Sequence, residues 1–395
     1  MYLVISEEYL AKLLADQNAS GGELVGRVLD NGNVVRLLDY DDPQNERVGK
    51  WLRVGQTLEG QSGDLLLVAG AEGQIETFRV EADGTLTEQE AERLVFYDDY
   101  QSRIQGLFDP SGLRHKTVAV IGLGTGGSIA AAELAKAGVG QMRLVDFDRL
   151  KVHNLVRHVC GLRDLGRYKT DALKDFLLNT SPFIGIETFN FDVTEDMERL
   201  EDVIQGCDLV IGATDSEVAK ALINRVAWEN GVPAVYGAAY EMGFGGDIFV
   251  ARPGWETEEG DLYGCYQCFR ISTADLFGEQ PHDEVEDYGV IRPQPALGMD
   301  VGMVALLMAR SAMGVLLRDD LTARIKPYPS NWILWGNQPE PGWIFDKPLQ
   351  SRFVDIWAVP DCSVCGLTQD EELAEQAREF VDHLDAPPDL PPGLR

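Results

Sequence analysis

Residues 116–178 decide the fold of the chain, and they read KTVAVIGLGTGGSIAAAELAKAGVGQMRLVDFDRLKVHNLVRHVCGLRDLGRYKTDALKDFLL. The β-favouring run Val118–Ile121 leads directly into the glycine-rich turn 122–127, and an alanine-rich helical pattern follows without a break. A strand, a glycine turn and a helix start in this order are typical of a phosphate site. Glycines let the backbone approach a phosphate closely, and unpaired N–H groups at the helix start point towards it. The stretch therefore predicts a phosphate-binding loop.

A second apolar run, Met142–Val145, predicts the next strand, and it ends at Asp146. At its distance along the chain from Gly122, a carboxylate can hold a ribose hydroxyl. Strand and helix patterns then alternate as far as about residue 250, which predicts an α/β fold with a doubly wound, mostly parallel, Rossmann-like sheet. The later expected strands are 185–189, 209–211 and 234–236, and the expected helices are 169–178, 196–204 and 217–229.

The bulk composition limits the possible partners. The chain has 395 residues, enough for two or three domains, with 45% apolar and 25% charged residues. Its formal net charge of −31 repels nucleic acid and anionic lipid, so neither is expected as a main partner. The same field repels ATP, so a nucleotide pocket in this chain must supply its own cations.

No targeting or membrane segment is expected. The first residues, MYLVISEEYLAKLL, lack the basic start of a signal peptide and carry two glutamates. The longest apolar run, 301–317, is interrupted by Arg310 and is too short to span a bilayer comfortably. The sequence therefore predicts a cytoplasmic protein.

The domain organisation has three expected parts. Residues 1–95 form a separate N-terminal α+β module with a helical pattern at 7–16 followed by β-like runs. No His precedes His115 and no Cys precedes Cys160, so this module cannot carry a His-ligated zinc hydrolase site, and we expect recognition or a structural role. Residues 96–370 form the main domain. Residues 371–395 form an acidic helix and a flexible tail.

Two segments lie outside the expected sheet. A charged connector, helical from Glu88 to Val95 and carrying Arg103 further on, leads into the sheet. Residues 269–298 cross over towards a strongly apolar helix at 298–316, and the acidic, proline-containing stretch from 272 to 295 predicts an irregular path.

Four of the six cysteines fall in two CxxC pairs, Cys265/Cys268 and Cys362/Cys365, the first expected in a loop. This two-plus-two spacing predicts a tetrahedral thiolate site for structural Zn²⁺, with redox cysteines as the alternative. The ion would pin the crossover and the C-terminal segment onto the sheet domain, and four protein ligands leave no open position for catalysis.

The residues after the glycine loop separate two possible ligands. Dehydrogenases that use a nicotinamide cofactor show the same loop and acidic residue, but they need no fixed cations over the phosphates. Here the next residues are Asp148, Asn154, Arg157 and Lys169, and two cations with a polar amide suit a triphosphate. Asp215, at the end of another expected strand, could hold Mg²⁺.

At this point the sequence resembles the ThiF/MoeB/HesA family, the adenylation core shared with ubiquitin-activating enzymes. The resemblance rests on residues 122–158, on GRYKTDAL at 166–173 and on IGATD at 211–215, and it covers roughly 97–365. The four cysteines resemble the zinc site of that family. The resemblance implies ATP-dependent activation of the C-terminal glycine carboxylate of a ubiquitin-like or sulfur-carrier protein, giving an acyl adenylate and pyrophosphate.

The resemblance also implies a role for each matching residue. Arg103 matches an arginine finger that the neighbouring protomer of a homodimer supplies, although Arg103, Asp148 and Lys169 could each be an ordinary surface ion-pair residue. Asp215 would bind Mg²⁺, and Asp148 would support the same site. The remaining matches are Gly122, Gly124 and Gly127 lining the nucleotide, Asp146 on the ribose, and Asn154, Arg157 and Lys169 on the phosphates.

Two departures from the family pattern matter. His158 stands where the family usually has Gln, which we interpret as a tolerated change behind the site. The crossover 269–298 contains no cysteine, whereas ubiquitin-activating enzymes place a nucleophilic thiol there. We therefore expect adenylation without a resident thioester, with Cys160 as the only internal exception.

Other readings of the same residues stay open. The carboxylate could belong to a short peptide or a small metabolite, with residues 1–95 binding a leader sequence. A scaffold that only binds a nucleotide and an oxidoreductase that uses a dinucleotide are further alternatives.

Overall fold

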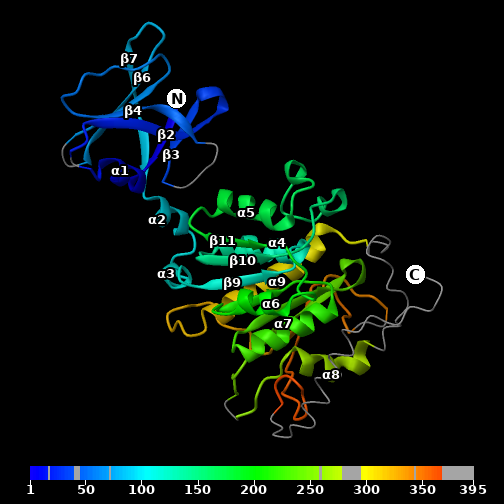
Figure 1. Cartoon of the computed structure of the whole chain (residues 1–395). Coiled ribbons are helices and arrows are strands. Elements are labelled where there is room, and N and C mark those ends of the chain that lie inside the picture. The colour runs from blue at the N-terminus through cyan, green and yellow to red at the C-terminus, as the bar shows by residue number, and fades with distance from the viewer. Residues whose placement is uncertain are drawn as a thin grey trace. The chain divides into compact units, whose positions relative to one another are not determined.

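The computed structural model describes residues 1–366, apart from 17, 40–44, 71–72, 258–259, 278–294 and 342–343. The chain divides into two compact units, Met1–Arg103 and Ile104–Arg395 (Figure 1). Each unit has a hydrophobic core of its own. The predicted acidic helix and tail, 371–395, lie outside the described residues.

The first unit is a mixed sheet with strand order β7-β6-β5-β4-β2-β3-β1-β8. Helix α1 (Glu7–Leu14) confirms the expected helix, and the side chain of Ser6 caps it by accepting a hydrogen bond from the Tyr9 backbone N–H. The strands are β1 (Tyr2–Ser6), β2 (Gly21–Leu29), β3 (Val34–Leu37), β4 (Glu46–Arg53), β5 (Leu65–Ala69), β6 (Ile75–Val80), β7 (Leu86–Gln89) and β8 (Ala91–Leu94).

The helix predicted from Glu88 to Val95 is wrong, because these residues are extended. β7 pairs with β6 and β8 pairs with β1, and only Glu90 separates β7 from β8. One extended segment therefore supplies both of the strands that lie at the ends of the sheet order. Its Glu, Gln, Ala and Arg residues favour helix locally, but the backbone hydrogen bonds to two neighbouring strands prevail. The helix of this connector is α2 (Phe96–Gln101).

The second unit contains the predicted doubly wound sheet. Its strand order is β11-β10-β9-β12-β13-β14-β15-β16, in which the first five strands are parallel and the last three join antiparallel. The parallel strands are β9 (Thr117–Ile121), β10 (Gln141–Val145), β11 (Gly185–Phe189), β12 (Leu209–Gly212) and β13 (Ala234–Ala239), and the others are β14 (Gly245–Ala251), β15 (Trp332–Gly336) and β16 (Gln350–Val354).

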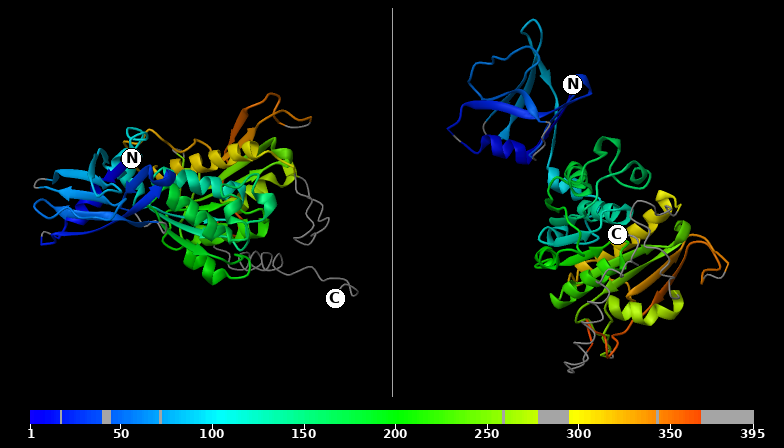
Figure 2. Two further views of the ribbon diagram at one scale, coloured as in Figure 1. Left: turned by 90° about the horizontal axis from the view of Figure 1, so that it is seen from above. Right: turned by 45° about the vertical axis from the view of Figure 1, so that its right-hand side comes forward.

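Helices cover both faces of this sheet (Figures 1 and 2). The short helix α3 (Pro110–Leu113) precedes β9. Helices α4 (Thr125–Lys136), α5 (Lys169–Thr180) and α9 (Gly298–Leu316) pack into one core, and α6 (Met197–Ile204), α7 (Glu217–Glu229) and α8 (Tyr266–Phe277) pack into the other. The crossover predicted as irregular therefore begins as helix α8.

Helix α9 is long and apolar enough, by length and composition, to cross a membrane. In the protein 61% of its most apolar window is buried, and it packs against α4 and strands β13 and β14. A core helix between a neighbouring helix and a sheet needs this all-round apolar surface.

The strand order of this sheet has a switch point between β9 and β12. The chain runs from β9 outward to β10 and β11, and then returns to place β12 on the other side of β9. Loops that leave β9 and β12 at their carboxyl ends therefore turn in opposite directions, and ligands of open α/β sheets bind at such a switch point. Gly122 follows β9 and Ala213 follows β12 at this edge.

Candidate functional site

The glycine loop after β9 has two glycines that the fold requires and one that faces open space. Gly122 has a φ of +86°, and a Cβ there would lie 2.6 Å from the carbonyl oxygen of Ala213. A Cβ on Gly127 would lie 1.9 Å from the carbonyl oxygen of Gly122. At Gly124, the residue just before helix α4, a Cβ would meet no atom of the described residues within 4 Å. The loop is therefore built by Gly122 and Gly127, while Gly124 leaves room for a ligand.

Asp146, at the end of β10, is buried and holds this loop. Its Oδ2 accepts the N–H of Leu123 at 2.7 Å, and its Oδ1 accepts the N–H of Asp148 at 2.8 Å. Burial raises the pKa of Asp146, and the Lys169 ammonium and the two N–H donors offset part of that rise. The Lys169 ammonium also contacts Oδ1 at 3.4 Å and Oδ2 at 3.3 Å, so a ribose hydroxyl would compete with this ammonium for the carboxylate.

Lys169, the first residue of α5, forms a buried ion pair rather than a surface one. Its Nζ lies 2.8 Å from Oδ2 of Asp148 and 3.3 Å from Oδ2 of Asp146. The side chains of Lys169 and Asp146 are only 9% and 8% exposed. The predicted contact between Lys169 and a phosphate stays a prediction, and it requires this ammonium to be shared with the two carboxylates.

Asn154 is the last residue of a short 3₁₀ segment, Val152–Asn154, and Arg157 lies on the tight turn that follows. The carbonyl oxygen of Asn154 accepts the N–H groups of Arg157 and His158, and its Oδ1 accepts the N–H of Lys151 at 2.8 Å. Arg157 is half-buried and lies along the start of α9, since a Cβ on Gly298 would be 3.5 Å from its Cγ. Within the described part of the chain, no carboxylate pairs with the Arg157 guanidinium.

The ring of His158 makes two buried hydrogen bonds that the sequence did not predict. It is buried, its Nε2 lies 2.9 Å from the carbonyl oxygen of Leu123, and its Nδ1 accepts the N–H of Cys160 at 3.0 Å. The side chain thus connects the glycine loop to the segment that carries Arg157. The departure from Gln at this position was the one sequence signal that could have drawn attention to it.

Asp215 is exposed and follows β12 at the same edge of the sheet as the glycine loop. The N–H of Ala213 donates to the carbonyl oxygen of Ile121 at 2.8 Å, so the loop after β12 starts directly beside Gly122. Mg²⁺ in nucleotide sites takes one or two carboxylates together with phosphate oxygens. The single carboxylate of Asp215 fits such a site.

Arg103 is exposed at the end of the first unit, just after α2. Its predicted role as an arginine finger from a neighbouring protomer stays a prediction.

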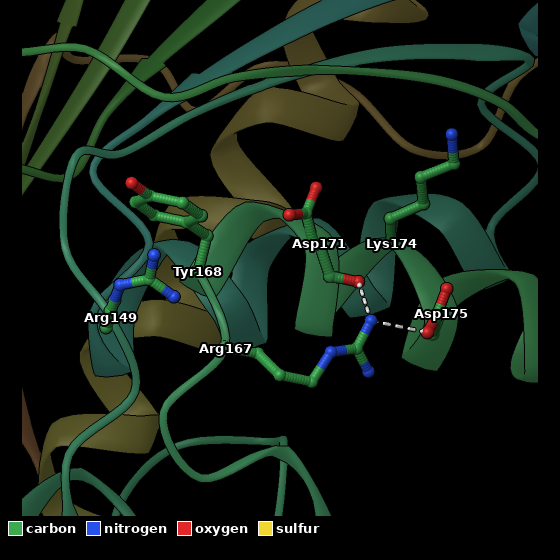
Figure 3. Close-up of a pocket in the computed structure, with 6 residues that line it drawn as sticks. All are labelled: Arg149, Arg167, Tyr168, Asp171, Lys174 and Asp175. Atoms are coloured by element: carbon green, nitrogen blue, oxygen red, sulfur yellow. Dashed lines mark hydrogen bonds and ion pairs between the residues drawn. The ribbon is translucent and has the colours of Figure 1, made fainter.

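A cavity of about 450 Å³ is lined by residues next to the Asp148–Lys169 pair in sequence (Figure 3). Arg167 reaches from its wall to Asp175 at 2.6 Å and Asp164 at 2.9 Å. The guanidinium of Arg149 lies 3.9 Å from the centre of the Tyr168 ring. Its lining residues are Arg149, Arg167, Tyr168, Asp171, Lys174 and Asp175. The contact between Arg149 and Tyr168 joins the residue after Asp148 to the residue before Lys169, so it helps to hold these two segments together.

The four predicted zinc ligands come together. The Sγ atoms of Cys265, Cys268, Cys362 and Cys365 all lie within 4.8 Å of one another, with Cys265 to Cys362 at 3.6 Å and Cys268 to Cys365 at 3.1 Å. A tetrahedral Zn²⁺ with bonds of about 2.3 Å needs sulfurs about 3.8 Å apart, whereas a disulfide needs about 2.05 Å. The cluster therefore fits zinc. The prediction that the first pair lies in a loop is half wrong, because Cys268 belongs to α8.

The other two cysteines are poor nucleophiles. Cys160 and Cys207 are both buried, and burial raises the pKa of the Cys160 thiol to about 12. Burial also raises the pKa of Cys207. Only a thiolate attacks an acyl group, so neither thiol is reactive at neutral pH in this fold.

A glycine loop, an acidic strand end and a buried lysine at the switch point of a mostly parallel sheet define a nucleotide-binding α/β protein. The chain belongs to the ThiF family, whose model matches residues 100–336.

Proteins of similar sequence support this family assignment. The molybdopterin-synthase adenylyltransferase of Salmonella typhimurium is 31% identical over 258 residues, which cover 64% of this chain and 88% of that protein. The sulfur carrier protein adenylyltransferase of Thermus thermophilus is 30% identical over 278 residues, 69% of this chain and 88% of that protein. The chain spans only 37% of the uncharacterized protein y4oA of Sinorhizobium fredii, with which it is 28% identical over 230 residues.

Among solved structures, the crystal structure of E. coli MccB with ATP matches with a TM-score of 0.51 and 19% sequence identity. The match covers 69% of this chain and 72% of that chain, and it shows that the two share a fold.

Proposed function

We propose that the protein uses ATP to adenylate the C-terminal glycine carboxylate of a ubiquitin-like or sulfur-carrier protein, giving an acyl adenylate and pyrophosphate. The observation that carries this proposal is the cradle at the switch point: among the described residues Gly124 faces open space, the neighbouring Leu123 N–H is bound by Asp146, and Lys169 pairs with Asp146 and Asp148. The relatives are named adenylyltransferases, and the chain shares their family.

The chemistry needs positioning and charge rather than a general base. A carboxylate is already an ionised nucleophile at neutral pH, and it attacks the α-phosphorus of ATP. A bond forms between the carboxylate oxygen and the α-phosphorus, and the bond to the β-phosphate oxygen breaks, so pyrophosphate leaves with its electron pair. The obstacle is the approach of one anion to another, which fixed cations and N–H donors relieve.

The net charge of the cradle shows that the site needs additional positive charge to bind ATP. Its carboxylates are Asp146, Asp148 and Asp215, and its cations are Arg157 and Lys169, so the balance is one negative charge. ATP adds about four more negative charges, which this site cannot hold alone. Bound Mg²⁺, held by Asp215 and phosphate oxygens, would supply positive charge over the phosphates.

A further cation would come from a second subunit. We propose a homodimer in which Arg103 of one protomer reaches the phosphates bound by the other, and a guanidinium suits this contact because it binds phosphate oxygens in pairs. In the same way, Asn154 and Arg157 would contact the phosphates and Asp146 the ribose. Structural Zn²⁺ in the cysteine cluster would hold α8 and the segment around Cys362 together.

The acyl group would pass to an outside acceptor. All six cysteines are accounted for, since four form the cluster and the thiols of Cys160 and Cys207 are buried. The crossover 269–298 has none. We therefore propose that no thioester forms on this chain, and we place the reaction in the cytoplasm.

Exchange of radioactive pyrophosphate into ATP tests the proposal. Exchange should require a partner protein that ends in glycine, and removing that terminal glycine should abolish it. The Arg157→Ala variant should lose exchange but keep its fold, because the side chain forms no ion pair within the described residues. Unchanged exchange in this variant would remove Arg157 from the mechanism.

The same assay separates the alternatives. Exchange driven by a short peptide or a free metabolite, with no response to carrier proteins, would replace the proposed substrate. ATP binding without exchange for any carboxylate would indicate a scaffold that only binds nucleotide.

A further inference from the structure

The peptide group between Leu123 and Gly124 is held on one side by an imidazole ring. The carbonyl oxygen of Leu123 lies 2.9 Å from Nε2 of His158, while the N–H of Leu123 is bound by Asp146. In a trans peptide the C=O and the following N–H point in opposite directions. Fixing the Leu123 carbonyl towards His158 therefore turns the Gly124 N–H to the other side, at the start of helix α4.

Two fixed partners determine the protonation of His158. The N–H of Cys160 can only donate, so Nδ1 must be the accepting nitrogen, and the carbonyl oxygen of Leu123 can only accept, so Nε2 must carry the hydrogen. The ring is therefore neutral with its proton on Nε2. A doubly protonated ring would place one N–H against another at Cys160.

The same residue also belongs to the segment of the predicted phosphate ligands. The His158 N–H donates to the carbonyl oxygen of Asn154 at 2.9 Å, and Arg157 is its direct neighbour in the chain. His158 thus joins the turn that carries Asn154 and Arg157 to the loop that carries Gly124. A shift of this ring would move the two halves of the cradle relative to each other.

We propose that His158 is a positioning residue that, while neutral, aligns the Gly124 N–H and the Arg157 segment for the phosphates of ATP. This role rests on the proposed function, because it needs a nucleotide in the cradle. Nucleotide binding should therefore weaken when the ring takes up a second proton.

The surroundings of the ring oppose that second proton. Burial lowers the pKa of His158; the bond to Leu123 raises it by a smaller amount, the ammonium of Lys169 on α5 lowers it further, and Asp164 raises it. Asp146 faces the same loop from the end of β10, and the neighbouring Cys160 thiol is uncharged because its pKa is raised to about 12. The ring is consequently neutral at pH 7 and above, and it loses this state only in acid.

Glutamine offers a matched test because its amide carries one donor and one acceptor group, as the neutral ring does, but does not titrate. In His158→Gln the amide NH₂ can donate to the Leu123 carbonyl and the amide oxygen can accept the Cys160 N–H. His158→Ala removes both bonds and leaves two buried backbone groups unpaired. The pair of variants separates the hydrogen-bond pattern from the charge.

The experiment is titration of the full-length protein with Mg·ATP by calorimetry between pH 5.5 and 8. At pH 8 we expect His158→Gln to bind within about twofold of the wild type and His158→Ala about tenfold more weakly, as the loss of one to two net hydrogen bonds implies. As the pH falls, the wild type should weaken relative to His158→Gln, whose own profile corrects for the titration of ATP. A ¹⁵N spectrum of the imidazole at pH 7.5 should show hydrogen on Nε2.

The outcomes are distinguishable. Wild-type protein that binds no ATP at any pH would overturn the proposed function and this role with it. If the wild type binds but His158→Ala matches it at pH 8, or if His158→Gln binds far more weakly than the wild type at that pH, the positioning role alone is wrong. Should His158→Ala fail to fold in a thermal unfolding control, the comparison of the wild type with His158→Gln decides.

Discussion

The ammonium of Lys169 lies 2.8 Å from Oδ2 of Asp148 and is also within 3.3 Å of Asp146, so one buried cation serves two carboxylates at the end of β10. This arrangement fixes the first turn of α5 to the strand that ends in Asp146. It also leaves Arg157 as the cation near the glycine loop that no described carboxylate neutralises. Removing the Lys169 ammonium would therefore change both the stability of the cradle and its net charge.

Replacing Lys169 should damage both stability and activity. In Lys169→Met the apolar stem is kept, but Asp146 and Asp148 lose their partner, and breaking a buried ion pair costs about 3–5 kcal/mol. We expect a clear loss in the free energy of unfolding and no detectable pyrophosphate exchange. Lys174→Met on the same helix is the control, since no described residue forms an ion pair with it, and it should leave both quantities near the wild type. Equal effects of the two changes would refute a special role for Lys169.

Two glycines of the same loop should respond in opposite ways to alanine. Gly122→Ala places a side chain at a φ of +86° and 2.6 Å from the Ala213 carbonyl oxygen, so the protein should be destabilised by more than the roughly 1 kcal/mol of left-handed backbone strain alone. Among the described residues the methyl group of Gly124→Ala meets no atom within 4 Å, so the variant should fold normally, but the methyl group would enter the cradle. Thermal unfolding and ATP affinity measure the two effects. A Gly124→Ala variant with unchanged affinity would show that the nucleotide does not pass this residue.

Local patterns made much of the site predictable. The glycine turn, the acidic end of β10 and the spacing of the cysteines are each encoded within a few residues, and the structure brings the four cysteines together and places the turn and Asp146 side by side. The contact between His158 and Leu123 joins residues 35 positions apart through a loop with no regular pattern, so sequence alone could not show it. The helix predicted from Glu88 to Val95 failed because its helix-favouring residues are held extended by pairing with the preceding strand β6 and with β1 at the start of the chain.

The cysteine cluster should bind zinc, and loss of that zinc should lower the stability of the fold. Cys265→Ser removes one of four sulfur ligands, so zinc measured by mass spectrometry should fall well below about one ion per chain, and the unfolding temperature should fall with it. Cys207→Ser is the matched control, because Cys207 is also buried but lies outside the cluster. Wild-type protein that keeps its unfolding temperature after zinc is removed by a chelator would contradict a structural ion.

A buried carboxyl on β14 should make stability depend on pH. Burial raises the pKa of Asp247 to about 6, and its Oδ2 accepts the N–H of Trp332 at 2.9 Å. A carboxyl whose pKa is higher in the folded state stabilises the fold while it is protonated, and that contribution is lost as the pH rises through about 6.

Asp247→Asn keeps the size and the acceptor but removes the titration. The variant and the wild type should be similarly stable at pH 4, and the variant should gain as the pH rises, by up to about 3 kcal/mol at pH 8 if the whole shift is expressed. Chemical denaturation across this range measures the difference, and the exposed Asp261→Asn serves as the control. A difference that does not change with pH would show that the folded pKa of Asp247 is not raised.

Mixing two inactive variants tests whether the active site is shared between protomers. If Arg103 acts on the nucleotide of the neighbouring protomer, Arg103→Ala and Arg157→Ala should each lose pyrophosphate exchange as homodimers. In a mixed dimer, the subunit that lacks Arg103 keeps its own Arg157 and receives Arg103 from its partner, so one of the two sites is intact. Random mixing of equal amounts makes half of the dimers mixed, so activity should return to about a quarter of the wild-type level.

The mixture gives a clear answer in either direction. Full activity of the Arg103→Ala homodimer would mean that Arg103 is an ordinary surface residue. If both homodimers are inactive and subunit exchange is verified by mass, a mixture that stays inactive would mean that Arg103 acts within its own chain, because each mixed dimer would then hold one defect per site. Recovery near one quarter would establish that the dimer is the catalytic unit, since the cation that the cradle lacks then comes from the other protomer.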